Sequence, residues 1–293
     1  MKRLLIPFAA AVAAALALVG CSSSDTGGTT TATSAAATSA AATSAGGSSA
    51  AGTTASSPGT AASSGAGDLS GELTIFAAAS LKKGFDELRD QFQTANPGVT
   101  VKEITYDGSS ALVTQIQGGA QVDVFASADT KNMDKITDMV DTPVEFATNT
   151  LQIAVAPGNP KGITGLADLA KPGVTVVLCA PEVPCGSAAH TALDKAGVSV
   201  TPVSEEQNVT AVLTKVASGD ADAGLVYRTD VMASEGKVDG VDFPAAADAV
   251  NHYPIAALKE ANNPDAAKAF IDLVTSDAGQ AVLADLGFGK PGT

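Results

Sequence analysis

The segment LTIFAAASLKKGFDELRDQF, residues 73–92, decides the fold, because a buried strand runs there directly into an amphipathic helix. Its first residues suit a core strand, three alanines make a turn of small residues, and leucine and phenylalanine then recur at helical spacing. We expect Ser80 to cap the helix, where free backbone N–H groups and the positive end of the helix dipole favour an anion. The alternative is that Ser80 caps its own helix and binds nothing.

The beginning of the chain differs in composition from the rest. Two basic residues precede a short apolar run that ends in small residues before Cys21, so residues 1–20 predict a secretory signal rather than a membrane span. This stretch resembles a bacterial lipoprotein signal, which implies cleavage before Cys21 and acylation of that cysteine; an uncleaved anchor is the alternative. The rest of 21–70 is almost wholly Ser, Thr, Ala and Gly and predicts a disordered tether.

Charge and cysteine content exclude some classes of function. The 293 residues include 31 acidic and 17 basic side chains, and no basic run follows the signal, so nucleic acid is not an expected partner. Cys179 and Cys185 are an even pair in an exported protein. Their spacing is not Cys-x-x-Cys and no further ligands stand nearby, so a disulfide is favoured over a zinc or redox site.

The unit of strand, turn and helix recurs in the first half of the folded part. Gly108-Ser109-Ser110 follows a strand at 99–105 and repeats the chemistry of Ser80, with hydroxyls and free N–H groups at the start of a helix. Asp129 follows the buried strand 122–126 and is expected to cap a helix rather than bind a metal. Strands that alternate with helices predict parallel α/β sheets.

A second lobe is expected to begin at the apolar strand TLQIAVAP, which ends in breakers. Here Asn208 is a good helix cap, which leaves the N–H of Val209 near a free helix end. Tyr227 ends a short strand, and the pattern alone assigns its ring to packing. Because 250–258 suits a strand that crosses back, the predicted division is a first lobe of 71–150 with 251–293 and a second lobe of 151–250.

A nucleophilic serine is a competing interpretation of the two serine turns. The pattern is not Gly-x-Ser-x-Gly, and the chain has only two histidines, His190 and His252, to act as a base. These two observations weigh against an exported serine hydrolase that uses Ser80 or Ser109, which we keep as the alternative in which the protein is an enzyme.

Together, five segments resemble the periplasmic molybdate-binding proteins of bacterial ABC importers, within the type II substrate-binding protein family. They are FAAASL at 76–81, GSS at 108–110, DVFASAD at 123–129, VPCG at 183–186 and GLVYRTD at 224–230. The resemblance covers residues 72–288. It implies an α/β Venus-flytrap fold in which two lobes, each a mostly parallel sheet flanked by helices, close over one tetrahedral oxyanion.

The resemblance also implies the residues that hold the oxyanion. Ser80 and Ser109 would offer hydroxyl and N–H groups, Cys185 and Val209 would offer backbone N–H groups, and Tyr227 would offer its phenol. The family often has alanine in place of Cys185, and this difference puts in question which oxyanion the site selects. A set made of donors without a carboxylate suits a fully deprotonated dianion and penalises protonated phosphate.

The function implied is capture of molybdate outside the cytoplasmic membrane and delivery to an ABC permease and its ATPase. Tungstate is nearly the same size, so it is expected as well. The expected protein is a monomer, lipid-anchored to the outer face of that membrane, with no catalytic activity, no cofactor and no bound metal cation. Alternatives are the same fold binding sulfate or another tetrahedral oxyanion, the hydrolase, and a surface adhesin presented by the tether.

Overall fold

The computed structural model describes residues 69–292. The predicted signal, the lipidation site Cys21 and nearly all of the predicted tether lie outside the described residues. Within 69–292, no helix is both long and apolar enough to cross a membrane.

The first five-stranded sheet has the order β4, β2, β5, β12, β6. Its strands are β2 (Ile75–Ala78), β4 (Thr105–Asp107), β5 (Val124–Ala126), β6 (Val144–Asn149) and β12 (Asn251–Ala257). β2 pairs in parallel with β4 and β5, whereas β12 pairs antiparallel with β5 and β6. A separate parallel pair is formed by β1 (Gly71–Leu73) and β3 (Val99–Val101).

The second five-stranded sheet has the order β11, β7, β10, β8, β9. Its strands are β7 (Leu151–Val155), β8 (Val176–Cys179), β9 (Ser204–Glu206), β10 (Ala223–Tyr227) and β11 (Asp239–Val241). β8 pairs in parallel with β9 and β10, whereas β7 pairs antiparallel with β10 and β11. We call each sheet with the helices packed on it a lobe, the first lobe being that of β2 and the second that of β8.

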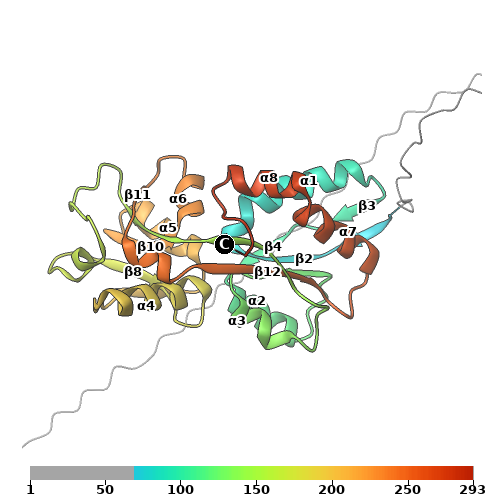
Figure 1. Ribbon diagram of the computed structural model, residues 1–293, viewed down its shortest axis with the longest axis horizontal. Helices are drawn as coiled ribbons and strands as arrows, with labels where there is room; N and C mark the ends of the chain where they lie inside the picture. The colour runs from blue at the N-terminus through green and yellow to red at the C-terminus, as the bar shows by residue number, and fades with distance from the viewer. Residues whose placement is uncertain (1–68, 293) are drawn as a thin grey trace, which may run out of the picture. The chain divides into compact units, whose positions relative to one another are not determined.

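Both sheets are mixed, so the prediction of mostly parallel sheets is wrong in this respect. The strands that pair in parallel are joined through helices, as parallel neighbours require. The antiparallel pairs involve the two segments that cross between the lobes: β6 continues into β7 after a single residue, and β12 carries the chain back. Figure 1 shows these long strands running between the two groups of helices.

Helices cover both sheets (Figure 1). The first lobe has α1 (Lys82–Ala95), α2 (Ser109–Gln117), α3 (Thr130–Met133), α7 (Pro264–Thr275) and α8 (Asp277–Asp285). The second lobe has α4 (Pro184–Ala196), α5 (Val209–Ser218) and α6 (Arg228–Ala233). Short 3₁₀ turns are η1 (Ala79–Leu81), η2 (Asp134–Ile136), η3 (Leu166–Ala170) and η4 (Pro244–Asp248).

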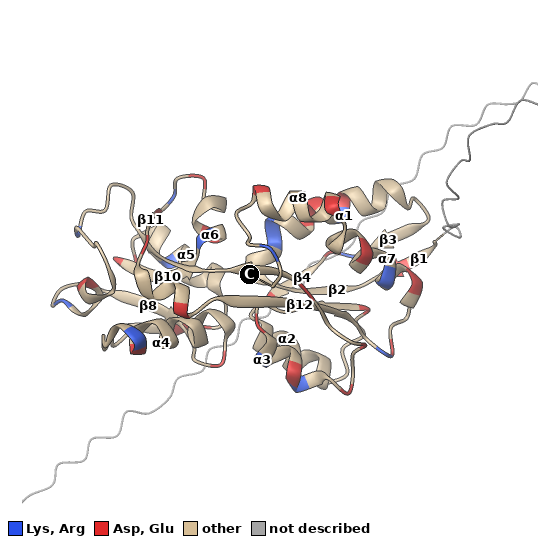
Figure 2. Cartoon of the chain, in the orientation of Figure 1, with Lys and Arg blue, Asp and Glu red and all other residues tan. Residues whose placement is uncertain are grey.

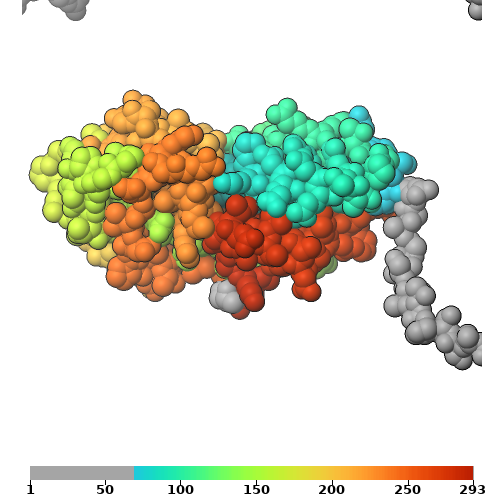
Figure 3. Space-filling model, turned by 90° about the horizontal axis from the view of Figure 1, so that it is seen from above, coloured from blue at the N-terminus to red at the C-terminus, as the bar shows by residue number. Residues whose placement is uncertain are grey.

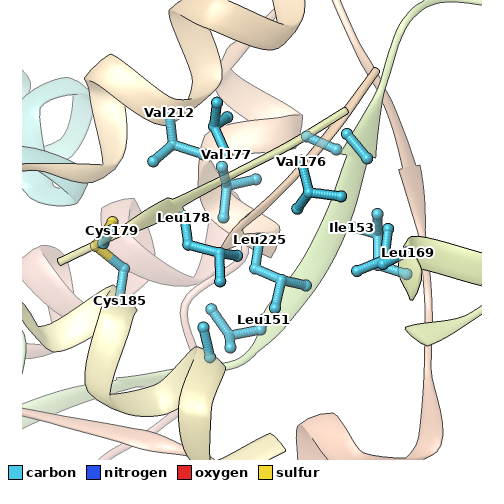
Figure 4. Close-up of a cluster of buried hydrophobic side chains, with 14 of the residues drawn as sticks. Leu151, Ile153, Leu169, Val176, Val177, Leu178, Cys179, Cys185, Val212 and Leu225 are labelled. Atoms are coloured by element: carbon cyan, nitrogen blue, oxygen red, sulfur yellow. A yellow bond between two sulfur atoms is a disulfide. The ribbon is translucent and has the colours of Figure 1, made fainter. Parts of the chain in front are cut away.

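Each lobe has its own hydrophobic core. In the first lobe, the apolar face of α1 buries Phe85 and Phe92, and both rings pack edge-on against Phe270 of α7. In the second lobe, aliphatic side chains from β7, β8 and β10 pack between α4 and α5. Figure 4 shows Leu178 and Leu225 in this core. The core of the second lobe is separate from the two hydrophobic clusters of the first lobe. A seam therefore lies between the lobes, and the carboxyl ends of β2 and β8 lead to it.

Candidate functional site

A small cavity of about 10 Å³ lies at the seam, with lining residues from both lobes. All five residues predicted to bind the oxyanion are in its lining: Ser80, Ser109, Cys185, Val209 and Tyr227. Cavities for drug-sized ligands are far larger, about 300–1,000 Å³, so this one has no room for such a ligand. Figure 3 shows the lobes pressed together where segments of the second lobe meet those of the first.

Ser80 does not cap α1, so that prediction is wrong. The helical conformation begins one turn earlier, at Ala79 in η1, and α1 continues from it with Leu81 as its N-cap. The Ser80 hydroxyl is instead hydrogen-bonded to the Tyr253 hydroxyl, 2.9 Å away, because β12 brings that ring under the turn. The N–H of Ser80 still lies in the first helical turn, where amides have no carbonyl partner within the helix.

Ser109 is the first residue of α2 and is fully buried. The backbone N–H of Ala128 donates to Ser109 Oγ over 3.0 Å. Because the oxygen accepts this bond, the hydroxyl proton is left to donate elsewhere. Ser109 can thus offer the cavity both a hydroxyl proton and a helix-start N–H.

The second lobe brings two helix starts to the same cavity. Cys185 is the second residue of α4, directly after Pro184, and Val209 is the first residue of α5. The side chain of Asn208 accepts a bond of 2.9 Å from the N–H of Ala211, which confirms the predicted cap. Amides in the first turn of a helix lack partners within it and carry the positive end of the dipole, so both starts suit an anion.

The structure contains a disulfide between Cys179 and Cys185. It joins the end of β8 to the first turn of α4, with Cα atoms 5.7 Å apart. Figure 4 shows it at the edge of the second lobe's core, next to Leu178. The bond ties the Cys185 side chain to the sheet, so residue 185 presents no free thiol to the cavity.

Tyr227 carries the clearest sign of a ligand. Its side chain is 1% exposed, and its hydroxyl makes no hydrogen bond of ordinary geometry among the described residues, although it lies close to the Tyr253 hydroxyl. Burial raises the pKa of Tyr227 well above its ordinary value, so the phenol keeps its proton. An unpaired buried hydroxyl costs about 1–3 kcal/mol, and an anion oxygen in the cavity would remove that cost.

Tyr253 is a supporting residue that sequence reasoning missed. It is fully buried in β12, packs edge-on against Tyr227 with ring centroids 6.0 Å apart, and is bonded to Ser80. The amide of Asn149 lies 3.4 Å from its hydroxyl. Tyr253 is one of three tyrosines in the chain and stands in a strand predicted to cross between lobes, and those were the only signals available.

The electrostatics of the cavity differ in one respect from the expectation. Its lining also includes Asp107, a residue outside the predicted ligand set. Asp107 Oδ1 accepts bonds from the N–H of Gly108 at 2.8 Å and from Asn208 Nδ2 at 2.9 Å. Within residues 69–292, no lysine or arginine lines the cavity. Figure 2 shows the charged residues spread over the outer helices and loops of both lobes.

The geometry gives no support to the alternatives of a metal or hydrolase site. Residues 69–292 contain no group of three or more His, Cys, Asp or Glu side chains that could hold a metal ion. In the same range, neither histidine is hydrogen-bonded to Ser80 or Ser109; His252 is bonded to Glu145 over 3.1 Å instead. A general base has to reach the hydroxyl it activates.

The predicted cap at Asp129 is confirmed, since its carboxylate accepts the N–H of Asn132.

The chain as a whole is similar to several known proteins. Residues 73–289 match the family described as bacterial extracellular solute-binding protein. The molybdate-binding protein ModA of Mycobacterium tuberculosis H37Rv is 48% identical over 235 residues, which are 78% of this chain and 90% of that protein. ModA of Escherichia coli K12 is 30% identical over 231 residues, 74% of this chain and 89% of that protein. A solved periplasmic molybdate-binding protein from Azotobacter vinelandii shares the fold, with a TM-score of 0.64 and 21% identity over 75% of this chain and 99% of its own.

Proposed function

Since this chain belongs to the bacterial extracellular solute-binding proteins, we propose that it captures molybdate between its lobes and delivers it to an ABC importer. Its relatives are binding proteins rather than enzymes, and we propose that this chain likewise makes and breaks no bond. The observation that carries the proposal is the buried Tyr227 hydroxyl, which has no hydrogen-bond partner among the described residues and lines the cavity together with two serines and two helix starts.

The donors suit a dianion that has no proton to give. Ser109 is set to donate because its oxygen already accepts the Ala128 N–H, and Tyr227 stays protonated. Hydrogen bonds to a charged group are each worth about 1.5–3 kcal/mol, so five such groups could hold an oxyanion without a lysine or arginine. Tungstate has the same charge and nearly the same size, and we propose it as a second ligand.

Closure of the lobes is the proposed functional event. The ligand set is divided between the lobes, so an oxyanion stabilises the closed form, and the permease recognises that form. For this motion we propose a first lobe of 71–150 with 251–293 and a second lobe of 151–250. We further propose that the protein acts as a monomer anchored through a lipid on Cys21, which would keep it close to its transporter.

Calorimetric titration of the intact protein with molybdate, tungstate and sulfate tests the proposal. We expect one-to-one binding of molybdate and tungstate with dissociation constants of about 1 µM or below, and sulfate at least roughly 100-fold weaker. Tighter binding of sulfate would replace the proposed ligand with a smaller oxyanion. Failure of a folded protein to bind any of the three would overturn oxyanion capture altogether, and turnover of an ester substrate would favour the hydrolase.

A further inference from the structure

One hydrogen bond joins the lobes at the rim of the cavity through side chains outside the proposed donor set. Asn208 Nδ2, just before α5 in the second lobe, donates to Asp107 Oδ1, at the end of β4 in the first lobe, over 2.9 Å. We propose that Asp107 and Asn208 are positioning residues that hold the starts of α2 and α5 together in the closed form. They thereby set the affinity for the oxyanion and its residence time. This inference rests on the proposed function.

Each member of the pair is also held within its own lobe. Asp107 Oδ1 accepts the backbone N–H of Gly108 at 2.8 Å, and Asn208 Oδ1 accepts the N–H of Ala211 at 2.9 Å. The pair therefore forms a continuous hydrogen-bonded link between the first turns of two helices that belong to different lobes. The proposed donors on these helices lie next to the link: Ser109 comes two residues after Asp107, and Val209 comes directly after Asn208.

The backbones meet at the same point. A Cβ atom on Gly108 would clash with the carbonyl oxygen of Gln207, in the other lobe, and would lie 3.2 Å from Val183 Cγ1. The φ of Gly108 is −61°, which any residue adopts, so glycine is needed here for space rather than for conformation. The two loops therefore approach each other closely at Gly108, next to the Asp107–Asn208 hydrogen bond.

Other polar contacts between the lobes are placed less well to control closure. Lys83 and Glu235 approach to 3.4 Å, but both side chains are exposed, and such pairs contribute little in water. Asn132 Nδ2 lies 3.5 Å from the carbonyl of Glu182, at the limit of a hydrogen bond. Asn149 donates to Thr229 over 2.8 Å, but Asn149 is the last residue of β6, so this bond lies where the chain crosses between the lobes.

The first test replaces Asn208 with serine. Serine caps a helix about as well as asparagine but has no Nδ2 to reach Asp107. For Asn208→Ser we expect roughly 10-fold weaker molybdate binding, expressed as faster release in stopped-flow measurements, and a smaller closed fraction in small-angle X-ray scattering with molybdate present. Asn263→Ser is the matched control, because Asn263 caps α7 and donates to the carbonyl of Glu72 within the first lobe; the affinity of this variant should stay at the wild-type value.

The second test exchanges the two side chains. Asn208→Asp keeps a cap but sets two carboxylates face to face, and we expect roughly 100-fold weaker binding. The double variant Asp107→Asn/Asn208→Asp restores an amide–carboxylate pair at unchanged net charge and should return to within about threefold of wild type. Unchanged release from Asn208→Ser, or no recovery in a folded double variant, would overturn the positioning role. Failure of the wild-type protein to bind molybdate would instead overturn the proposed function.

Discussion

The two lobes present their proposed donors in different ways. The first lobe uses serine hydroxyls, each held by a bond from elsewhere in that lobe: Ser80 to Tyr253 and Ser109 to Ala128. The second lobe uses backbone N–H groups at Cys185 and Val209, together with the unpaired phenol of Tyr227. The difference teaches that loss of a side chain should be severe in the first lobe and mild at the two main-chain positions of the second.

The largest effect is expected from Ser109→Ala. The change removes a proposed donor and also leaves the buried N–H of Ala128 without its acceptor, so molybdate affinity should fall by roughly 100-fold or more. Calorimetric titration measures it. Ser110→Ala is the matched control, because Ser110 is the next residue of α2 but does not line the cavity. Equal affinity of the two variants would contradict the assignment of Ser109.

Tyr227→Phe should separate binding from stability. Loss of the phenol removes one proposed donor, so we expect molybdate affinity to fall by roughly 10- to 100-fold. Without ligand, the variant should be as stable as wild type or more so, because the hydroxyl it loses is buried and unpaired. Titration and urea unfolding of the ligand-free protein check the two signs. A less stable ligand-free variant would mean that the hydroxyl has a structural role.

The second lobe also contains a buried carboxylate, Asp230, next to Tyr227. This carboxylate should make the free energy of unfolding depend on pH. Asp230 in the first turn of α6 accepts the N–H of Tyr227 over 2.9 Å, and burial raises its pKa to about 7. The pKa of an aspartate in the unfolded chain is about 4. Between this value and the folded pKa, the carboxyl of Asp230 is protonated in the folded state but ionised in the unfolded state. The free energy of unfolding therefore falls as pH rises through this range and levels off above it.

Asp230→Asn keeps an acceptor for that N–H and removes the titration. We expect wild type to lose up to a few kcal/mol more than the variant between pH 5 and pH 8, measured by urea unfolding. The pKa values of Glu206, bonded to Lys215, and of Asp222, which accepts bonds from Thr175, are lowered, so their contributions are lost only on the acid side of this window. Identical losses in the two proteins would show that Asp230 stays charged.

The smallest effect on binding is expected where the second lobe donates through its main chain. Replacing both Cys179 and Cys185 by serine removes a disulfide between residues six positions apart in the sequence. We expect the free energy of unfolding to fall by about 2 kcal/mol. Molybdate affinity should change by less than roughly fivefold, because the N–H of residue 185 remains. Thermal unfolding and titration measure the two. A much larger loss of affinity would show that the disulfide itself shapes the site.

The helix starts could be predicted from sequence more reliably than the site that they form. Asn208 and Asp129 cap their helices as predicted, because a cap depends on residues within three positions. The cap at Ser80 was wrong because its hydroxyl has a partner 173 residues away, which a local pattern does not contain. The sheets proved mixed for a similar reason: pairing of the crossing strands depends on which lobe each strand joins.

By itself, the sequence determined the alternation of strands and helices, the serine turns and the family, since burial periodicity, turn chemistry and motif order lie along the chain. Only the tertiary structure decided which polar groups have partners. It pairs Asp107 with Asn208, 101 residues apart, and it leaves the Tyr227 hydroxyl buried and unpaired. These outcomes depend on how two independently packed lobes meet, and local sequence carries no signal for that contact.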